Sequence, residues 1–276
     1  MKLPEDITAQ VKHALIEDIG TGDVTADLIP KENTSSAKVV CRDDAILVGV
    51  EWFNEVFKQI DSEVEINWNF KDGDHVAANE IICTLSGNSR SILSGERAAL
   101  NFTQTLSATA TQTNRFVKLI EHTKTKVLDT RKTIPNMRDA QKYAVLCGGG
   151  KNHRIGLYDM ILIKENHIMA AGSITAAVTQ AKKLHPDIRV EVETETLEEF
   201  REASEANADV IMLDDFDLKT MQIAVEENAG KIDLEASGGI NLDTILAIAQ
   251  TGVDYISIGQ ITKDVIAVDL SMRFDN

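Results

Sequence analysis

Basic side chains gather in one stretch of an otherwise acidic chain. Between Lys124 and Lys164 there are nine Lys or Arg and three acids, whereas the 276-residue chain has a formal net charge of -16. The basic residues that follow apolar or glycine-rich segments are Arg131, Lys132, His153, Arg154 and Lys164. Guanidinium and ammonium groups bind carboxylates and phosphates. The stretch therefore predicts a cavity that holds an anion.

A solvated basic face is the alternative explanation, and it is the commoner one for a charge run. Surface charge usually recurs at helical spacing, but Arg131, Lys132 and Lys164 come directly after the apolar runs VLDT and MILI. Six residues that favour loops interrupt the stretch: Asn136, Gly148, Gly149, Gly150, Asn152 and Gly156. The spacing therefore favours the cavity.

The composition excludes several classes of protein. Nucleic acid is not an expected partner of an acidic chain, because its binding needs a basic surface. No apolar run reaches the roughly 18 residues of a membrane span, and the first residues lack a signal-peptide pattern. We therefore expect a cytoplasmic protein without a membrane partner. The three cysteines, Cys41, Cys83 and Cys147, lack metal-site spacing and are expected to be reduced.

The first 90 or so residues predict a small α+β module. ITAQVKHALIEDI and WFNEVFKQI have helical spacing, and SAKVVCRDDAILVGV predicts a strand pair that turns at Arg42–Asp44. EVEINWNF and EIICTLSG, with Asp72-Gly73 between them, predict a hairpin. A long helix from about Ser89 to His122 follows, with Ser94 as a candidate cap. Taken by itself, Arg97 is expected to be an ordinary residue of that helix.

From Val127 onward, short apolar runs alternate with amphipathic helices. The runs are KVLDT, MILIK, IRVEVE, VIMLD, IDLEAS and YISIG. This alternation predicts βα units around a parallel sheet. The polar ends of successive runs lie 29, 21, 23 and 22 residues apart, at Lys164, Glu193, Asp214, Ser237 and Gly259. Such regularity, and the absence of a GxGxxG motif after the first run, favours a closed or nearly closed barrel over a doubly wound sheet. A seventh strand is expected near residues 105–125 or 145–158, and the tail VIAVDLSMRF is expected to return to the N-terminal module.

The ends of these runs carry two further kinds of group. Glu193 and Asp214 could hold a hydrated Mg²⁺ or bind sugar hydroxyls, although acids are common in this half of the chain. Ser237-Gly238-Gly239 and Ser257-Ile258-Gly259 fit a phosphate site between adjacent strands and helices, although tight turns use glycine too. Together with the basic cluster, these groups suit a substrate with two carboxylates and a second, phosphorylated substrate.

At this point the chain resembles the quinolinate phosphoribosyltransferase family, the decarboxylating nicotinate-nucleotide pyrophosphorylases. The resemblance covers nearly the whole chain, and its most specific segments are DTRKTIP and NHRIGLYDMILIKENHI. It implies an α/β fold with an N-terminal sandwich-like domain (1–105, joined by 264–276) and a C-terminal incomplete, seven-stranded type of barrel (106–263). It also implies transfer of phosphoribose from 5-phosphoribosyl-1-pyrophosphate to quinolinate with Mg²⁺, giving nicotinate mononucleotide, pyrophosphate and CO2 for NAD biosynthesis.

The resemblance also implies roles for individual residues. Quinolinate would be bound by Arg131, Lys132, His153, Arg154 and Lys164, with Thr130 beside them and with Lys132 and Lys164 also near the pyrophosphate. Glu193 and Asp214 would hold the ribose hydroxyls and the metal. The 5-phosphate would be bound by Ser237, Gly238, Gly239, Ser257 and Gly259. Arg97 would enter the site of the partner subunit in a homodimer.

Two departures and two rival functions accompany this assignment. Lys263 stands where the family often has His, and Ser107–Thr111 reads SATAT in place of an SGIAT-like segment. A Schiff-base aldolase that uses Lys164 is the first rival, since a lysine that ends a barrel strand suits that chemistry. A non-catalytic paralogue, such as the related molybdenum-transport-associated proteins, is the second, and the retained basic and acidic set argues against it.

Overall fold

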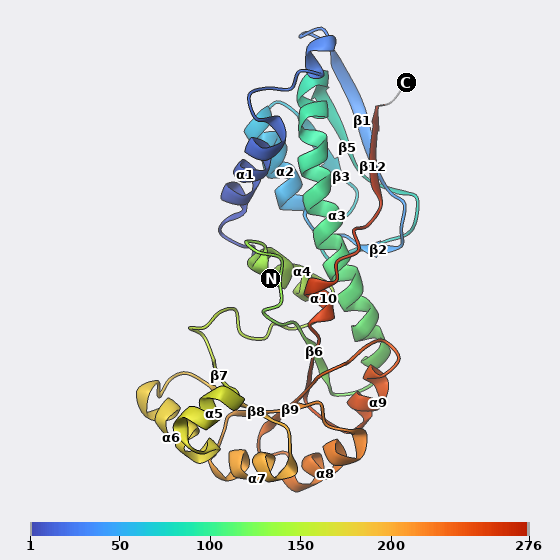
Figure 1. The fold of residues 1–276 in the computed structure, drawn as a ribbon. Coiled ribbons are helices and arrows are strands. Elements are labelled where there is room, and N and C mark those ends of the chain that lie inside the picture. The colour runs from blue at the N-terminus through green and yellow to red at the C-terminus, as the bar shows by residue number, and fades with distance from the viewer. Residues whose placement is uncertain (1, 275–276) are drawn as a thin grey trace. The chain divides into compact units, whose positions relative to one another are not determined.

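The computed structural model describes residues 2–274 and has the expected α/β architecture (Figure 1). The chain forms two compact units. Among the described residues, the N-terminal unit contains 2–114, 134–149 and 264–274, and the barrel unit contains 115–133 and 150–263. Helix α3 (Ser89–Ile120) contains the first boundary between them.

The sheet of the N-terminal unit has four strands in the order β12-β1-β5-β3. Their bounds are β1 (Thr34–Cys41), β3 (Glu65–Trp68), β5 (Glu80–Asn88) and β12 (Leu270–Phe274). The antiparallel pairing of β3 with β5 confirms the predicted hairpin, and that of β12 with β1 confirms the return of the tail.

The strand pair predicted around Arg42–Asp44 is wrong. β2 (Ala45–Ile46) pairs with β4 (His75–Val76) and not with β1. The reason is that β5 and β12 already occupy the two edges of β1.

Three helices besides α3 belong to this unit. They are α1 (Ile7–Ile19), α2 (Val50–Ile60) and α4 (Arg138–Cys147), and a short 3-10 turn, η1, covers Ala26–Leu28. Trp52, Phe53 and Phe57 of α2 are almost fully buried, as the helical spacing of its apolar residues predicts. The buried side of α4 contributes Ala140 and Tyr143 to the same core.

The compact units divide the chain at α4 differently from the expected domain ranges. The sequence places all of 106–263 in the barrel domain, whereas the compact units assign 134–149 to the N-terminal unit. The difference arises because α4 is buried in the core of the N-terminal unit. The alternation of strands and helices in the sequence does not indicate which of two cores a helix packs against.

Helix α3 begins at Ser89, so Ser94 lies inside the helix and does not cap it. The Ser94 hydroxyl instead donates to Asp23 at 2.7 Å. Farther along the helix, the SATAT segment (Ser107–Thr111) forms hydrogen bonds with the backbone of β2 and of the residues after it. The backbone N–H of Val48 donates to the Ser107 hydroxyl and that of Ile46 to the Thr111 hydroxyl, both at 2.9 Å.

The barrel unit is built on six parallel strands in the order β6-β11-β10-β9-β8-β7. They are β6 (Lys126–Leu128), β7 (Ile161–Ile163), β8 (Val190–Thr194), β9 (Val210–Asp214), β10 (Asp233–Ser237) and β11 (Tyr255–Ser257). All six predicted runs are therefore strands. A single bridge between Leu128 and Lys151 lies where a seventh strand was expected, so the barrel is incomplete among the described residues.

Helices connect these strands. Their bounds are α5 (Glu165–Ala171), α6 (Ile174–Leu184), α7 (Leu197–Glu205), α8 (Leu218–Asn228), α9 (Ile245–Gln250) and α10 (Gln260–Lys263). Figure 1 shows α6, α7, α8 and α9 along the outer side of the curved sheet. The start of α7 is a capping box, in which Thr196 and Glu199 each bind the backbone N–H of the other.

The register of the sheet places inward-facing side chains in rows. Glu193, Met212 and Glu235 are partners across β8, β9 and β10, and Asp214 and Ser237 are partners nearer the carboxyl ends. Side chains two residues apart on a strand share a face. The strand ends therefore present one polar rim, as predicted. Among residues 2–274, no helix is both long enough and apolar enough to cross a membrane.

We predict that Tyr143→Phe destabilises the protein by about 1.5–3 kcal/mol, the usual value of a hydrogen bond to a charged group. The Tyr143 hydroxyl donates to Asp72 at 2.9 Å, and the other oxygen of that carboxylate accepts the N–H groups of Gly49 and Val50 at the start of α2. The midpoint of urea unfolding measures the loss. Tyr158→Phe is the matched control, because its side chain is exposed, and an equal effect of both variants would contradict the assignment.

Candidate functional site

The polar rim of the barrel unit encloses a cavity of about 410 Å³. Ten of the fourteen predicted site residues line it: Thr130, Arg131, Lys132, His153, Arg154, Lys164, Glu193, Asp214, Ser237 and Ser257. The remaining lining residues are Leu162, Met212 and Glu235. Residues from every strand of the sheet, or from the segments next to them, thus meet in one concave site.

Four predicted residues do not line the cavity. Gly259 lies beside it, since a Cβ on Gly259 would come within 3.0 Å of the Lys132 side chain. Gly238 has φ +96°, and a Cβ there would lie 1.9 Å from a carboxylate oxygen of Asp215, so this turn accepts only glycine. Gly239 also has a positive φ. Arg97 lies on α3 in the N-terminal unit, with an exposed side chain.

Local hydrogen bonds hold the segment after β6 in place. The backbone N–H of Lys132 donates to the Thr130 hydroxyl at 3.1 Å, and the Thr262 hydroxyl donates to the Lys132 carbonyl at 2.8 Å. Thr262 belongs to α10, whose last residue is Lys263. These bonds present Arg131 and Lys132 at the cavity with little backbone freedom.

Lys164 follows β7 directly and forms an ion pair with Glu193. Its backbone N–H donates to Nδ1 of His167 at 3.0 Å, which holds the residue at the start of α5. Glu193 is mostly covered, whereas about half of the Lys164 side chain is exposed. The pair therefore places one ammonium group at the cavity in a defined position while leaving it accessible to a ligand.

Two guanidinium groups approach each other in the site. Arg154 donates from Nη1 to the Met160 carbonyl at 3.2 Å, and its loop is closed by Asp159, which accepts the backbone N–H groups of Ile155 and Gly156. Burial, and then the charge of Arg131, lowers the pKa of Arg154. Nε of Arg131 is buried without a hydrogen-bond partner. The unmet donor of Arg131 and the repulsion between the two guanidinium groups both favour the binding of an anion here.

The cavity also offers carboxylates. Asp214 and Ser237 are adjacent on β9 and β10, and Glu193 is one strand farther along the sheet. Oxygen donors of this kind suit a hard divalent cation such as Mg²⁺, which usually keeps several waters and uses one or two protein carboxylates. Glu193 and Asp214 therefore fit the predicted metal role, which stays a prediction.

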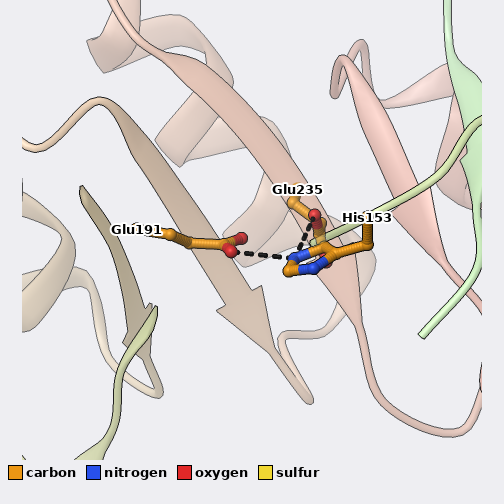
Figure 2. A group of neighbouring side chains, drawn as sticks. All are labelled: His153, Glu191 and Glu235. Carbon is orange, nitrogen blue, oxygen red and sulfur yellow. Dashed lines mark hydrogen bonds and ion pairs between the residues drawn. The ribbon is translucent and has the colours of Figure 1, made fainter. Parts of the chain in front are cut away.

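A buried group beneath the rim was missed by the sequence-based prediction. Nε2 of His153 lies 2.8 Å from a carboxylate oxygen of Glu191 and 3.5 Å from one of Glu235, and Figure 2 shows both glutamates pointing toward the ring. Each glutamate also has one buried oxygen without a hydrogen-bond partner. The signal was present in the sequence, since Glu191 and Glu235 precede Glu193 and Ser237 by two residues and so face the same interior.

Burial raises the pKa of Glu235 well above its ordinary value, and the nearby charge of Glu191 raises it further. Two carboxylates in one apolar interior cannot both ionise at low cost. The interior of the barrel therefore favours a neutral Glu235 beside the cavity.

Comparisons with protein-family models agree with the resemblance seen in the sequence. A model described as the N-terminal domain of quinolinate phosphoribosyl transferase matches residues 23–107. A second model, described as the C-terminal domain, matches residues 109–273. The two matches together cover most of the chain.

Individual relatives match over nearly the full length. The probable nicotinate-nucleotide pyrophosphorylase (carboxylating) of Bacillus subtilis is 43% identical over 263 residues, which cover 95% of this chain and 91% of the relative. A chloroplastic enzyme of the same name from Arabidopsis thaliana is 40% identical, with 98% and 83% covered. The solved structure of the nicotinate-nucleotide pyrophosphorylase from Francisella tularensis is 52% identical, with a TM-score of 0.97 and with 99% and 98% of the two chains covered.

We predict that Glu235→Gln gains more stability over the wild type at pH 8 than at pH 5. The unfolded chain releases the Glu235 proton as the pH rises past about 4.3, whereas the folded state retains it because its pKa is raised. The free energy of unfolding of the wild type therefore falls with rising pH, and Gln removes that loss.

Urea unfolding of both proteins at the two pH values measures the difference. The exposed Glu226→Gln is the control, and its offset from the wild type should be the same at both pH values. If the difference in unfolding free energy between Glu235→Gln and the wild type were also the same at both pH values, the pKa of Glu235 would not be raised in the folded protein.

Proposed function

This chain belongs to the quinolinate phosphoribosyl transferase family, and we propose that it catalyses the reaction for which its relatives are named. In that reaction, quinolinate takes phosphoribose from 5-phosphoribosyl-1-pyrophosphate and loses one carboxylate. The products are nicotinate mononucleotide, pyrophosphate and CO2. The observation that carries the proposal is a single cavity lined by four cationic side chains in a chain of net charge -16.

The cationic side of the cavity suits a pyridine dicarboxylate. Arg131 and Arg154 offer forked donors that match a carboxylate, and the two lysines add point charges. Binding in one orientation would direct the ring nitrogen toward C1 of the ribose. The entropy lost in bringing the two reacting atoms together would then be offset by substrate binding. Lys132 and Lys164 would also contact the pyrophosphate.

The carboxylates of the cavity suit the sugar and the metal. Glu193 and Asp214 would bind the ribose hydroxyls and Mg²⁺, which when bound would balance the charge of the pyrophosphate. Their negative charge would also stabilise positive charge that develops on the sugar. Ser237, Ser257 and the glycine turn at Gly238 would receive the 5-phosphate through backbone N–H groups.

Decarboxylation follows naturally from the first step. Once the ring nitrogen has bonded to the sugar, it carries a positive charge. The bond from the ring to the adjacent carboxylate can then break, because its electron pair is stabilised by that charge while CO2 leaves. The ring carbon finally takes up a proton.

The structure offers an argument against the aldolase alternative. Lys164 contacts Glu193 and is one of four cationic side chains around the cavity, an arrangement that suits an anionic ligand better than a lone Schiff-base lysine. The relatives named above are all named as enzymes, which argues against a non-catalytic paralogue. A cytoplasmic location remains a prediction from composition.

We expect the purified protein to form nicotinate mononucleotide from quinolinate, 5-phosphoribosyl-1-pyrophosphate and Mg²⁺, and to form none when nicotinate replaces quinolinate. Lys164→Ala should lower kcat by about 10²–10³, as removal of one group that stabilises transition-state charge does. Circular dichroism should show that the variant is folded. Lys219→Ala, which removes an exposed lysine from α8, is the control. No product from the wild type would refute the proposed function.

A second prediction concerns the subunits. We propose that the enzyme is a homodimer in which Arg97 completes the partner's site. Arg97→Ala and Lys164→Ala should each be nearly inactive, whereas a 1:1 mixture allowed to exchange subunits should recover roughly a quarter of wild-type activity, because half of the dimers would contain one intact site. No recovery from a mixture proven to exchange would contradict the shared site.

A further inference from the structure

The imidazole of His153 is held at both of its nitrogens. The backbone N–H of Arg154 donates to Nδ1 at 2.8 Å, and Nε2 lies 2.8 Å from Glu191. Although His153 lines the cavity, only 7% of its side chain is exposed. The ring is thus a part of the protein interior that borders the site.

These contacts determine where the ring carries its proton. Nδ1 accepts a hydrogen bond, so it has no proton of its own, and a neutral ring must then be protonated at Nε2. Nε2–H donates to Glu191, with Glu235 as a second and longer acceptor at 3.5 Å. In this state neither nitrogen offers an N–H to an anion in the cavity.

The same geometry argues against a metal ion between the three side chains, although a histidine and two glutamates are a common ligand set. A metal at Nε2 would require that nitrogen to lose its proton while Nδ1 already lacks one. The ring would then be a negatively charged imidazolate. Two neighbouring carboxylates make that form of the ring unfavourable.

We propose that Glu191 and Glu235 are positioning residues for substrate binding, which hold His153 in its Nε2-protonated form so that the loop presents Arg154 to the dicarboxylate. This inference rests on the proposed function. Three bonds converge on the two residues of the loop: His153 N–H to Asp129 at 2.9 Å, Arg154 N–H to Nδ1, and Arg154 Nη1 to the Met160 carbonyl. Removing the anchor at Nε2 frees the ring and with it the acceptor of the Arg154 N–H.

The arrangement also explains why a site for an anion has Glu235 in its lining and Glu191 buried next to His153. A charged carboxylate facing quinolinate would repel it, but Glu191 is fully buried and directed at the ring, and Glu235 is favoured in its neutral form. The negative charge of Glu191 therefore accepts a hydrogen bond from His153 in the interior and does not face the ligand.

The form of the ring can be tested without any activity assay. In the protein labelled with ¹⁵N-histidine, the His153 signals, identified by their loss in His153→Phe, should show a proton on Nε2 and none on Nδ1 near pH 7. A doubly protonated ring, or a proton on Nδ1, would overturn the proposal. So would a tightly bound metal ion whose removal by a chelator shifts these signals.

Kinetics test the positioning role. Glu191→Leu should raise KM for quinolinate by about tenfold or more, the value of one hydrogen bond to a charged group, with a smaller change in KM for 5-phosphoribosyl-1-pyrophosphate. Glu191→Gln retains an acceptor for Nε2–H and should restore KM for quinolinate to within about threefold of the wild type.

A double-mutant cycle shows whether Glu191 acts through His153. If it does, Glu191→Leu combined with His153→Phe should raise KM for quinolinate no more than His153→Phe alone. Additive effects, or a Glu191→Leu variant that loses only thermal stability, would overturn the proposal while leaving the proposed function intact. Failure of the proposed function would instead be seen as an inactive wild type.

Discussion

The repulsion between four cationic side chains in one cavity is the constraint on which the rest of this structure depends. Such a cluster persists in the absence of an anion only if rigid elements hold it, and three of its four members here have such a support. Lys164 is paired with Glu193, the Lys132 backbone is tied to Thr130 and Thr262, and the Arg154 loop is closed by Asp159. Burial, and then the charge of Arg131, lowers the pKa of Arg154, and an anion bound between the two guanidinium groups would offset both effects.

The parallel sheet is the element that makes this concentration of charge possible. Because all six strands run in the same direction, their carboxyl ends meet at one rim, and residues separated by more than a hundred positions become neighbours. The register then sorts them by depth. Asp214 and Ser237 lie at the rim, Glu193 and Glu235 lie one row below, and Glu191 is deeper still. Groups of the upper two rows line the cavity, whereas Glu191 in the third row does not.

The buried carboxylates illustrate a cost of this design. Glu191 and Glu235 each retain an oxygen without a hydrogen-bond partner, which in a protein interior is unfavourable. Apolar residues would be more stable at these positions. Met212, which lies between Glu193 and Glu235 in one row of the sheet, is an example of such a residue. The presence of the two glutamates around His153 agrees with a role in the geometry of the site, and functional sites often carry local strain.

The sequence by itself determined the elements and most of the site. Apolar periodicity predicted the six parallel strands and the long helix, local charge with strand-end position predicted nine of the residues that line the cavity, and the family resemblance added Thr130. The tertiary structure decided what depends on contacts between distant segments. These are the pairing of β1 with β12, the inclusion of α4 in the N-terminal unit, and the meeting of Glu191, Glu235 and His153. Periodicity records which face of an element is buried, but not which other segment covers it, because that choice depends on packing between segments that are distant in sequence.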